Sequence, residues 1–171
     1  NQAWQPKEAI RAIRLFEDKG LEIELVEQPV HKNDIQGLKM VTDATATPIM
    51  ADESVFSPLD AFEVLRTRSA DLINIKLMKT GGIHKAVIIN KMAETCGVEC
   101  MIGSMIESRL AVTAAAHFAA SQRNITRFDL DAPLMLADDR IIGGIQYKGT
   151  KMTFTDTYGL GIKGVEGMDR K

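Results

Sequence analysis

The chain has 171 residues, of which 45% are hydrophobic and 26% are charged, and its formal net charge is −2. These values are typical of one globular domain with a hydrophobic core. The basic residues are spread along the chain, and no apolar run approaches the roughly 20 residues of a membrane-spanning helix, so we expect neither nucleic acid nor a membrane as a partner. The two cysteines, Cys96 and Cys100, lack a histidine at zinc-like spacing, and we expect both to be reduced, partly buried thiols in a cytoplasmic protein.

Helical and strand-like patterns alternate from the first residues onward. Pro6 suits the first turn of a helix that Gly20 ends. Ile10, Ile13 and Phe16 form the apolar stripe of this helix. The same reasoning predicts helices over residues 6–19, 34–43, 58–68, 83–95 and 110–120. Short apolar runs bounded by turn residues predict strands over residues 21–26, 48–51, 72–76, 98–102 and 126–131.

The C-terminal ends of the predicted strands recur every 24 to 27 residues. They fall at Glu27, Asp52, Lys76, Gly103 and Asp129. Alternating strands and helices predict a parallel sheet, and a regular period predicts a repeated βα unit. A complete barrel has eight strands and about 250 residues, whereas only five strands are found here. We therefore predict an α/β fold that forms the C-terminal portion of a TIM-type (β/α)8 barrel.

The sequence pattern changes after Asp139. Residues 1–139 are predicted to form the βα units of the barrel. Residues 140–171 contain alternating segments and glycine turns, which predict a β-hairpin followed by a tail that packs on something outside the barrel. We expect the chain to be the C-terminal part of a longer protein in which another strand ends just before Asn1.

Charged side chains at the strand ends indicate catalysis, because barrel enzymes place their catalytic groups there. Glu27 and Asp52 would supply the hard carboxylate oxygens that Mg²⁺ binds, although two carboxylates are few for such a site. Lys76 would lie across the barrel mouth from this metal, where a lowered pKa would let it act as a general base. Such a pair removes a proton next to a carboxylate while the metal stabilises the enediolate.

Each lysine in this region also has a simpler interpretation. Lys76 could extend its ammonium group to water without any catalytic role. Lys79 falls beyond the strand end, so we expect a solvated turn residue rather than a second base.

Six stretches of the sequence resemble the enolase superfamily, in particular its muconate-lactonizing subgroup, and most of all the dipeptide epimerases. They cover almost the whole chain in the right order and spacing. The stretches are NQAW (residues 1–4), VEQP (26–29), MADES (50–54), NIKLMKTGG (74–82), MIGSMIES (101–108) and FDLD (128–131).

The resemblance implies a role for each matching position. Glu27 and Asp52 would be the second and third Mg²⁺ ligands, and Lys76 would be one of two acid–base lysines. The first ligand, the opposing lysine and an N-terminal capping domain, toward which residues 140–171 would pack, are expected outside this chain. Because inversion of a stereocentre needs a base on each face, the chain alone would not hold a complete epimerase site.

The residues at the end of the last predicted strand indicate which substrate is bound. Asp129 and Asp131 resemble the Asp-x-Asp of dipeptide epimerases, which holds the α-ammonium group of the substrate, and paired carboxylates recognise a cation well. The alternative is that one aspartate caps the following turn. By the same resemblance, Ser104 and Met105 would line the pocket. The predicted function is Mg²⁺-dependent epimerisation of a dipeptide at the α-carbon of its C-terminal residue.

Other functions remain open at this point. Within the superfamily they are N-acylamino-acid racemase, o-succinylbenzoate synthase and muconate cycloisomerase chemistry. Outside enzymes, the chain could be a half-barrel scaffold subunit that completes a barrel with a partner. The preferred dipeptide and the oligomeric state, including a homo-oligomer, are also open.

Overall fold

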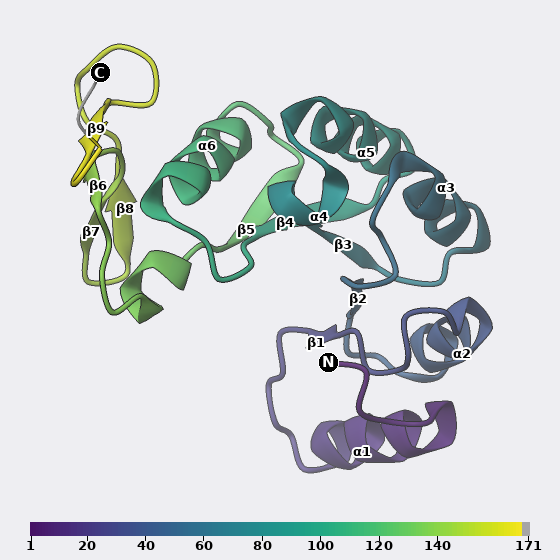
Figure 1. Cartoon of the computed structure of the whole chain (residues 1–171). Coiled ribbons are helices and arrows are strands. Elements are labelled where there is room, and N and C mark those ends of the chain that lie inside the picture. The colour runs from purple at the N-terminus through teal and green to yellow at the C-terminus, as the bar shows by residue number, and fades with distance from the viewer. Residues whose placement is uncertain (169–171) are drawn as a thin grey trace.

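The computed structural model describes residues 1–168 and shows a five-stranded parallel sheet with helices between its strands (Figure 1). The strands are β1 (Val26–Glu27), β2 (Ile49–Ala51), β3 (Leu72–Lys76), β4 (Glu99–Gly103) and β5 (Ile125–Asp129). The helices are α1 (Pro6–Asp18), α2 (Ile35–Ala44), α3 (Pro58–Thr67), α4 (Leu77–Thr80), α5 (Ile83–Thr95), α6 (Arg109–Ala120) and the 3₁₀ helix η1 (Ala132–Met135). The spatial order of the strands equals their order in sequence, and all four neighbouring pairs are parallel, which confirms the predicted parallel sheet.

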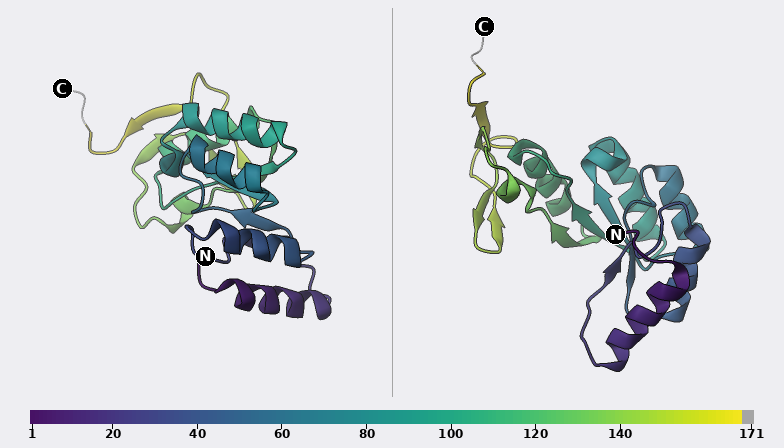
Figure 2. Two further views of the ribbon diagram at one scale, coloured as in Figure 1. Left: turned by 90° about the vertical axis from the view of Figure 1, so that its right-hand side faces the viewer. Right: turned by 60° about the horizontal axis from the view of Figure 1, so that its bottom comes forward.

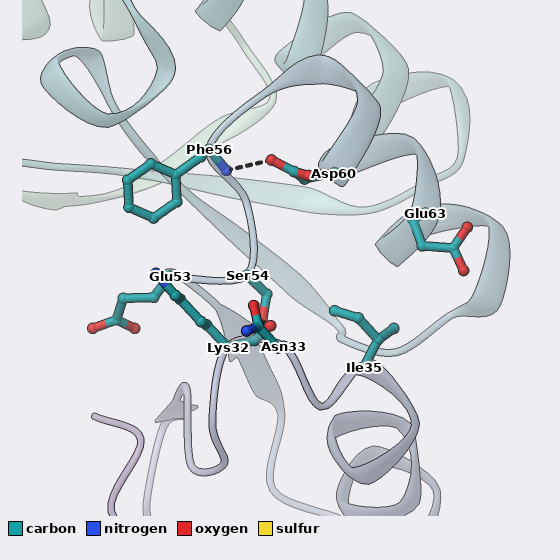
Figure 3. Close-up of a pocket in the computed structure, with 8 residues that line it drawn as sticks. All are labelled: Lys32, Asn33, Ile35, Glu53, Ser54, Phe56, Asp60 and Glu63. Carbon is teal, nitrogen blue, oxygen red and sulfur yellow. Dashed lines mark hydrogen bonds between the residues drawn. The ribbon is translucent and has the colours of Figure 1, made fainter.

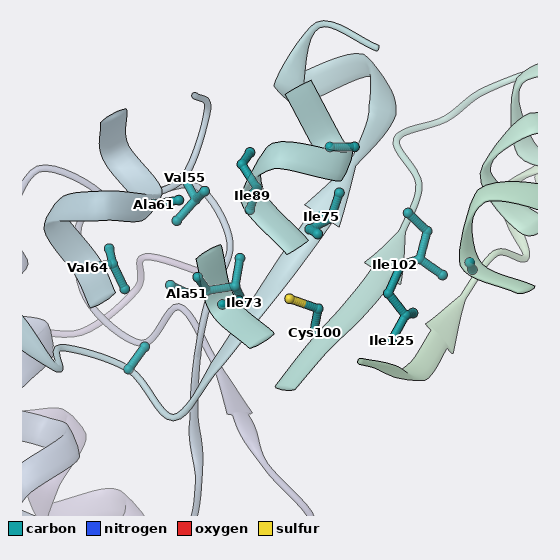
Figure 4. Packing of buried hydrophobic residues seen from close by; sticks show 14 of the residues in the cluster. Ala51, Val55, Ala61, Val64, Ile73, Ile75, Ile89, Cys100, Ile102 and Ile125 are labelled. Carbon is teal, nitrogen blue, oxygen red and sulfur yellow. The ribbon is translucent and has the colours of Figure 1, made fainter. Parts of the chain in front are cut away.

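The sheet is an open arc with helices along its outer side. In Figure 1, α2, α3, α5 and α6 follow the outside of the arc, and α1 packs beside α2. The core lies between the strands and these helices, where Ile73 and Ile75 of β3 are fully buried with Ile89 of α5 (Figure 4). Burying such a side chain contributes roughly 1.5–3 kcal/mol, so this layer holds the helices against the sheet.

Local capping signals explain where several helices begin and end. Asp34 accepts a hydrogen bond from the Gly37 N–H at the start of α2, and the Ser57 hydroxyl accepts one from the Asp60 N–H at the start of α3. Arg68 ends α3 in the left-handed conformation, with φ of 51°. Among the described residues, no helix is both long enough and apolar enough to cross a membrane.

The main difference from the predicted elements concerns the first strand. The apolar run from Leu21 predicted a strand over residues 21–26, but β1 contains only Val26 and Glu27. Its partner β2 begins at Ile49, which pairs with Val26, so the earlier residues extend past the start of the ladder. Leu21 is 49% exposed, consistent with a segment that has no strand beside it.

The C-terminal segment forms antiparallel strands, which Figure 2 shows beyond the α6 end of the arc. β6 (Ile141–Gly143) pairs with β9 (Ile162–Val165), and β7 (Gln146–Lys148) pairs with β8 (Lys151–Thr153). The Ile145 N–H donates to Thr113 Oγ1 of α6 at 3.1 Å, and the Tyr147 hydroxyl donates to the Leu130 carbonyl at 2.6 Å. These bonds fasten the segment to the last βα unit. Its contact with a capping domain stays a prediction, and the end of the predicted tail, residues 169–171, lies outside the described residues.

The two cysteines carry free thiols, as the sequence predicted, but in different surroundings. Cys100 is buried in β4, and burial raises the pKa of its thiol to about 12. Cys96 is exposed at the end of α5, so the prediction that its thiol is partly buried is wrong. Cys100 is therefore a core residue.

Candidate active site

The predicted site positions lie along one edge of the sheet. Glu27, Lys76, Gly103 and Asp129 are the last residues of β1, β3, β4 and β5, and Asp52 directly follows β2. Gly103 pairs with Lys76 on one side and with Asp129 on the other. Because the strands are parallel and in register, their C-terminal ends form a continuous row.

The carboxylate of Asp52 is the centre of this row, and it is buried. Its Oδ2 accepts a hydrogen bond from Lys76 Nζ at 2.7 Å, and its Oδ1 accepts one from Lys79 Nζ at 2.6 Å. Asn1 Nδ2 lies 3.2 Å from Oδ2. A single buried carboxylate is thus shared by two ammonium groups, one on each oxygen.

The prediction that Lys79 is a solvated turn residue is wrong. Its side chain is only 2% exposed, and besides Asp52 Oδ1 it donates to the Asn74 carbonyl at 2.9 Å and to the Asp52 carbonyl. The chain does not leave the sheet after Lys76 but turns directly into α4. Lys79 lies in the first turn of α4, and its ammonium group reaches the same Asp52 carboxylate as that of Lys76. The spacing K-x-x-K, combined with a helical turn, was the signal that could have identified it.

The two lysines differ in how their surroundings change their pKa values. Burial lowers the pKa of Lys79, and the neighbouring Asp52 charge offsets this only in part. For Lys76, burial also favours the neutral form, but the hydrogen bond and charge of Asp52, with Glu27 and Glu53, outweigh it and raise the pKa. The lowered pKa predicted for Lys76 presupposed a nearby divalent cation, and without that charge the shift has the opposite direction.

Glu27 has its own polar partner, which sequence reasoning missed. Asn74 Nδ2 donates to Glu27 Oε1 at 2.6 Å from a fully buried position on β3. Asn74 Oδ1 is also buried and has no partner within the described residues. A Cβ atom at Gly103 would lie 2.6 Å from Asn74 Oδ1 and 3.1 Å from Lys76 Cε. The glycine at the end of β4 therefore provides the space that both side chains occupy.

The carboxylates fit a magnesium site in kind but not in number. Glu27 and Asp52 offer hard oxygens on adjacent strands, which are the ligands that Mg²⁺ prefers. Within residues 1–168, no group of three or more His, Cys, Asp or Glu side chains is placed to hold a metal ion. Two carboxylates do not make up a full ligand set, and the role of Glu27 and Asp52 as Mg²⁺ ligands stays a prediction.

The aspartates of the last strand lie at the far end of the row. Asp129 and Asp131 are both exposed, and within residues 1–168 neither carboxylate accepts a hydrogen bond. Asp131 precedes η1 but makes no side-chain capping bond, so the structure does not support the turn-capping alternative for it. Partial burial and then the Asp131 charge raise the pKa of Asp129. The local repulsion would be relieved by a bound cation.

Ser104 and Met105 follow β4 beside these aspartates. The Ser104 hydroxyl donates to the Asp129 carbonyl at 3.3 Å. Met105 is 46% exposed, and its N–H donates to Glu107 Oε1 at 2.8 Å. Both residues are therefore accessible from the edge at which the strands end.

A pocket of about 400 Å³ lies next to this row (Figure 3). It is bounded by the segments that follow β1 and β2, with Lys32 and Phe56 on opposite segments. Glu53 lines it, but Glu27, Asp52, Lys76 and Asp129 do not. We therefore place the candidate site along the strand ends and not in this pocket.

The class of protein follows from this row of carboxylates and lysines on part of a parallel barrel. The chain belongs to the Enolase C-terminal domain-like family, whose family model matches residues 1–167. This membership confirms the resemblance drawn from the sequence, and with it the prediction that the fold is the C-terminal portion of a (β/α)8 barrel.

Particular relatives in this family are dipeptide epimerases. The chain is 71% identical over 164 residues to the L-Ala-D/L-Glu epimerase of Bacillus subtilis. The aligned region covers 96% of this chain and 45% of that enzyme. The solved structure of a substrate-liganded complex of the B. subtilis enzyme matches with a TM-score of 0.95 and 70% identity over 96% of this chain and 46% of the other. The dipeptide epimerase of Enterococcus faecalis V583, complexed with Mg and L-Leu-L-Tyr, matches with a TM-score of 0.90 and 51% identity, covering 95% and 46% of the two chains.

The chain therefore spans less than half of the length of the relatives it matches. The rest of those proteins has no counterpart among these 171 residues.

Proposed function

We propose that this chain is the C-terminal part of the catalytic barrel of a Mg²⁺-dependent dipeptide epimerase, which inverts the α-carbon of the C-terminal residue of its substrate. The observation that carries the proposal is the row of Glu27, Asp52, Lys76 and Asp129 along one sheet edge, with Lys76 Nζ 2.7 Å from the Asp52 carboxylate. The high identity to dipeptide epimerases supports the same conclusion.

Glu27 and Asp52 would hold the metal ion, together with a ligand from outside this chain. Mg²⁺, when bound, supplies positive charge that stabilises the additional negative charge on the substrate carboxylate after the α-proton is removed. Asn74 would keep the Glu27 carboxylate oriented through its 2.6 Å hydrogen bond.

Lys76 would exchange the α-proton at Nζ on one face of the substrate. Its ammonium group now pairs with Asp52 Oδ2, so it must leave this oxygen and lose a proton before it can act as a base. Inversion also requires a proton donor or acceptor on the opposite face, and we propose that a residue outside this chain supplies it.

Asp129 and Asp131 would bind the α-ammonium group of the dipeptide, with Ser104 and Met105 beside it. Two carboxylates that accept no hydrogen bond within residues 1–168 have the charge and the unused acceptor positions that an ammonium group requires. N-acylamino-acid racemase chemistry is the second candidate, and this pair disfavours it because an N-acylated substrate carries no ammonium group. A cytoplasmic location and self-association stay predictions.

Solvent exchange tests the proposed function directly. The complete protein is incubated in D₂O with Mg²⁺ and a panel of L,L-dipeptides, and each α-proton is followed by NMR. We expect Mg²⁺-dependent exchange at the second residue only, and stereospecific loss of this exchange in Lys76→Ala. Lys91→Ala is the matched control, because Lys91 is exposed and pairs only with Glu94 on α5.

The second candidate and the scaffold alternative give different results in the same assay. Replacing both Asp129 and Asp131 with Asn should raise the KM for dipeptides at least about tenfold, the effect of losing roughly 1.4 kcal/mol of binding energy. Unchanged dipeptide kinetics in this variant, or exchange with N-acyl amino acids alone, would favour the racemase. No exchange with any substrate would favour the non-catalytic half-barrel.

A further inference from the structure

Two lysines share the Asp52 carboxylate, but their bonding is unequal. Lys76 is 13% exposed at its side chain and donates to Oδ2 alone. Lys79 is 2% exposed and donates to three oxygens, Asp52 Oδ1, the Asp52 carbonyl and the Asn74 carbonyl. An ammonium group has three donors, so the hydrogen-bonding capacity of Lys79 is fully used and that of Lys76 is not.

The bonding of Lys79 makes it a fixed partner. A buried ammonium group is unfavourable unless it is paired and hydrogen-bonded, and any movement of Lys79 would break three bonds without access to water. Lys76 can exchange its single bond for water or for another partner. Of the two carboxylate oxygens, Oδ1 is therefore permanently occupied, and Oδ2 is the oxygen that can change partner.

The main chain at Asp52 is held as firmly as its side chain. The Asp52 N–H donates to Gln28 Oε1 at 2.9 Å, and Gln28 is fully buried at the end of β1. With the main chain held by Gln28 and Oδ1 held by Lys79, the Asp52 side chain has one orientation. In this orientation Oδ2 points to Lys76 and Asn1 at the strand ends.

We propose that Lys79 is a positioning residue for the metal ligand Asp52: it holds Oδ1 so that Oδ2 is presented to Mg²⁺, which takes the place of Lys76. This inference rests on the proposed function, because Asp52 is a metal ligand only if that function is correct. Lys79 is not a second base, since its ammonium group is buried against Asp52 and is shielded from any substrate at the sheet edge.

Magnesium affinity tests the role of Lys79 because the loss of its charge and the loss of its hydrogen bonds are expected to change the affinity in opposite directions. Removing a positive charge next to the site should tighten cation binding if charge alone matters. Removing a hydrogen-bond partner that orients a metal ligand typically weakens affinity about 10–100-fold. In the complete protein we expect Lys79→Met to weaken Mg²⁺ binding by about 10–100-fold in isothermal titration calorimetry. Unchanged or tighter binding would overturn the proposal.

Lys32→Met is the matched control. Lys32 Nζ lies 5.5 Å from the centre of the Phe56 ring and Lys79 Nζ lies 5.8 Å from it, so both variants remove an ammonium group beside the same ring. Lys32 is exposed, and within residues 1–168 the ion pairs of Asp52 are with Lys76 and Lys79 and not with Lys32. Mg²⁺ affinity should be unchanged in this variant, and an equal loss in both variants would mean that the effect is not specific to Lys79.

A measurement on the unmodified protein keeps the proposal testable if Lys79→Met does not fold. In ¹⁵N-lysine NMR, the Lys79 ammonium signal should be protected from exchange and should keep its position when Mg²⁺ is added, whereas the Lys76 signal should shift. Equal shifts of both signals would overturn the proposal.

The role of Lys79 and the proposed function can fail separately. A protein that binds Mg²⁺ and epimerises dipeptides, and whose Mg²⁺ affinity is unchanged in Lys79→Met, would refute the role of Lys79 alone. A protein that binds no Mg²⁺ would refute the proposed function as well.

Discussion

At the scale of single residues, the space around the candidate site depends on one glycine. Gly103 ends β4 between Lys76 and Asp129, and the side chains of Asn74 and Lys76 occupy the volume next to it. Its main-chain conformation is not the reason for glycine here, because its φ is not positive. The reason is the close approach of the Asn74 and Lys76 side chains.

We therefore expect Gly103→Ala to destabilise the protein by about 1–3 kcal/mol, the usual effect of adding a methyl group to a filled interior. The new Cβ would lie 2.6 Å from Asn74 Oδ1 and 2.9 Å from its Nδ2, and this amide cannot move without releasing Glu27. Denaturant unfolding followed by circular dichroism measures the change. Gly164→Ala in β9 is the control, because its Cβ would meet only Ile142 Cδ1 at 3.9 Å. If Gly103→Ala lowered the free energy of unfolding by less than about 0.5 kcal/mol, the neighbouring side chains would have adjusted to the added methyl group.

At the scale of elements, a buried amide joins the ends of two strands. Gln28 follows β1 with a φ of 36°, and its side chain points to the segment after β2. Its Oε1 accepts from the N–H groups of Asp52 and Ser54, and its Nε2 donates to Ser54 Oγ and to the Val30 carbonyl. The two short strands β1 and β2, with few ladder bonds of their own, are thereby held in register at the site.

Gln28→Met should destabilise the protein by about 2–6 kcal/mol, since it leaves the buried Asp52 and Ser54 N–H groups without an acceptor at roughly 1–3 kcal/mol each. Met has a similar length, so packing changes little. Chemical denaturation gives the free energy of unfolding, and Gln36→Met on the exposed side of α2 serves as the control. Equal stabilities of the two variants would contradict a joining role for Gln28.

At the scale of the whole molecule, the site is an edge rather than an enclosed pocket. The sheet is an open arc with β1 and β5 at its ends, and Phe128 on β5 is 56% exposed. The carboxylates of Glu27 and Asp52 provide fewer metal ligands than a full set within the described residues. The proposed chemistry therefore needs groups on the opposite side of the barrel mouth.

We expect residues 1–171 alone to show no epimerase activity with Mg²⁺, because the proposed function assigns the second proton carrier and a further metal ligand to residues outside this chain. Activity should appear only in the complete protein. The assay is again α-proton exchange in D₂O, with the complete protein as the positive control and folding of the isolated chain verified by circular dichroism. Inversion by the isolated chain would show that Lys76 and groups within residues 1–171 are sufficient.

Local pattern along the chain determined the alternation of helices and strands, the C-terminal ends of the strands and the family. The helix and strand predictions depend on neighbouring residues, such as the apolar stripe of α1 and the buried run before Lys76. The length of the first strand was overestimated, because an apolar run becomes a strand only where another strand lies beside it, and residues 21–25 have none. Residue type and strand position together also indicated Glu27, Asp52 and Lys76.

Only the tertiary structure decided how these side chains are paired. Lys79 is buried because α4 folds it back over Asp52, a residue 27 positions earlier, and Asn74 reaches Glu27 across 47 positions. Gly103 is required by the side chains of the neighbouring strand, not by its own turn. Such contacts arise when distant segments meet at one sheet edge, where a buried charge must find its partners, and no local periodicity encodes which partners those are.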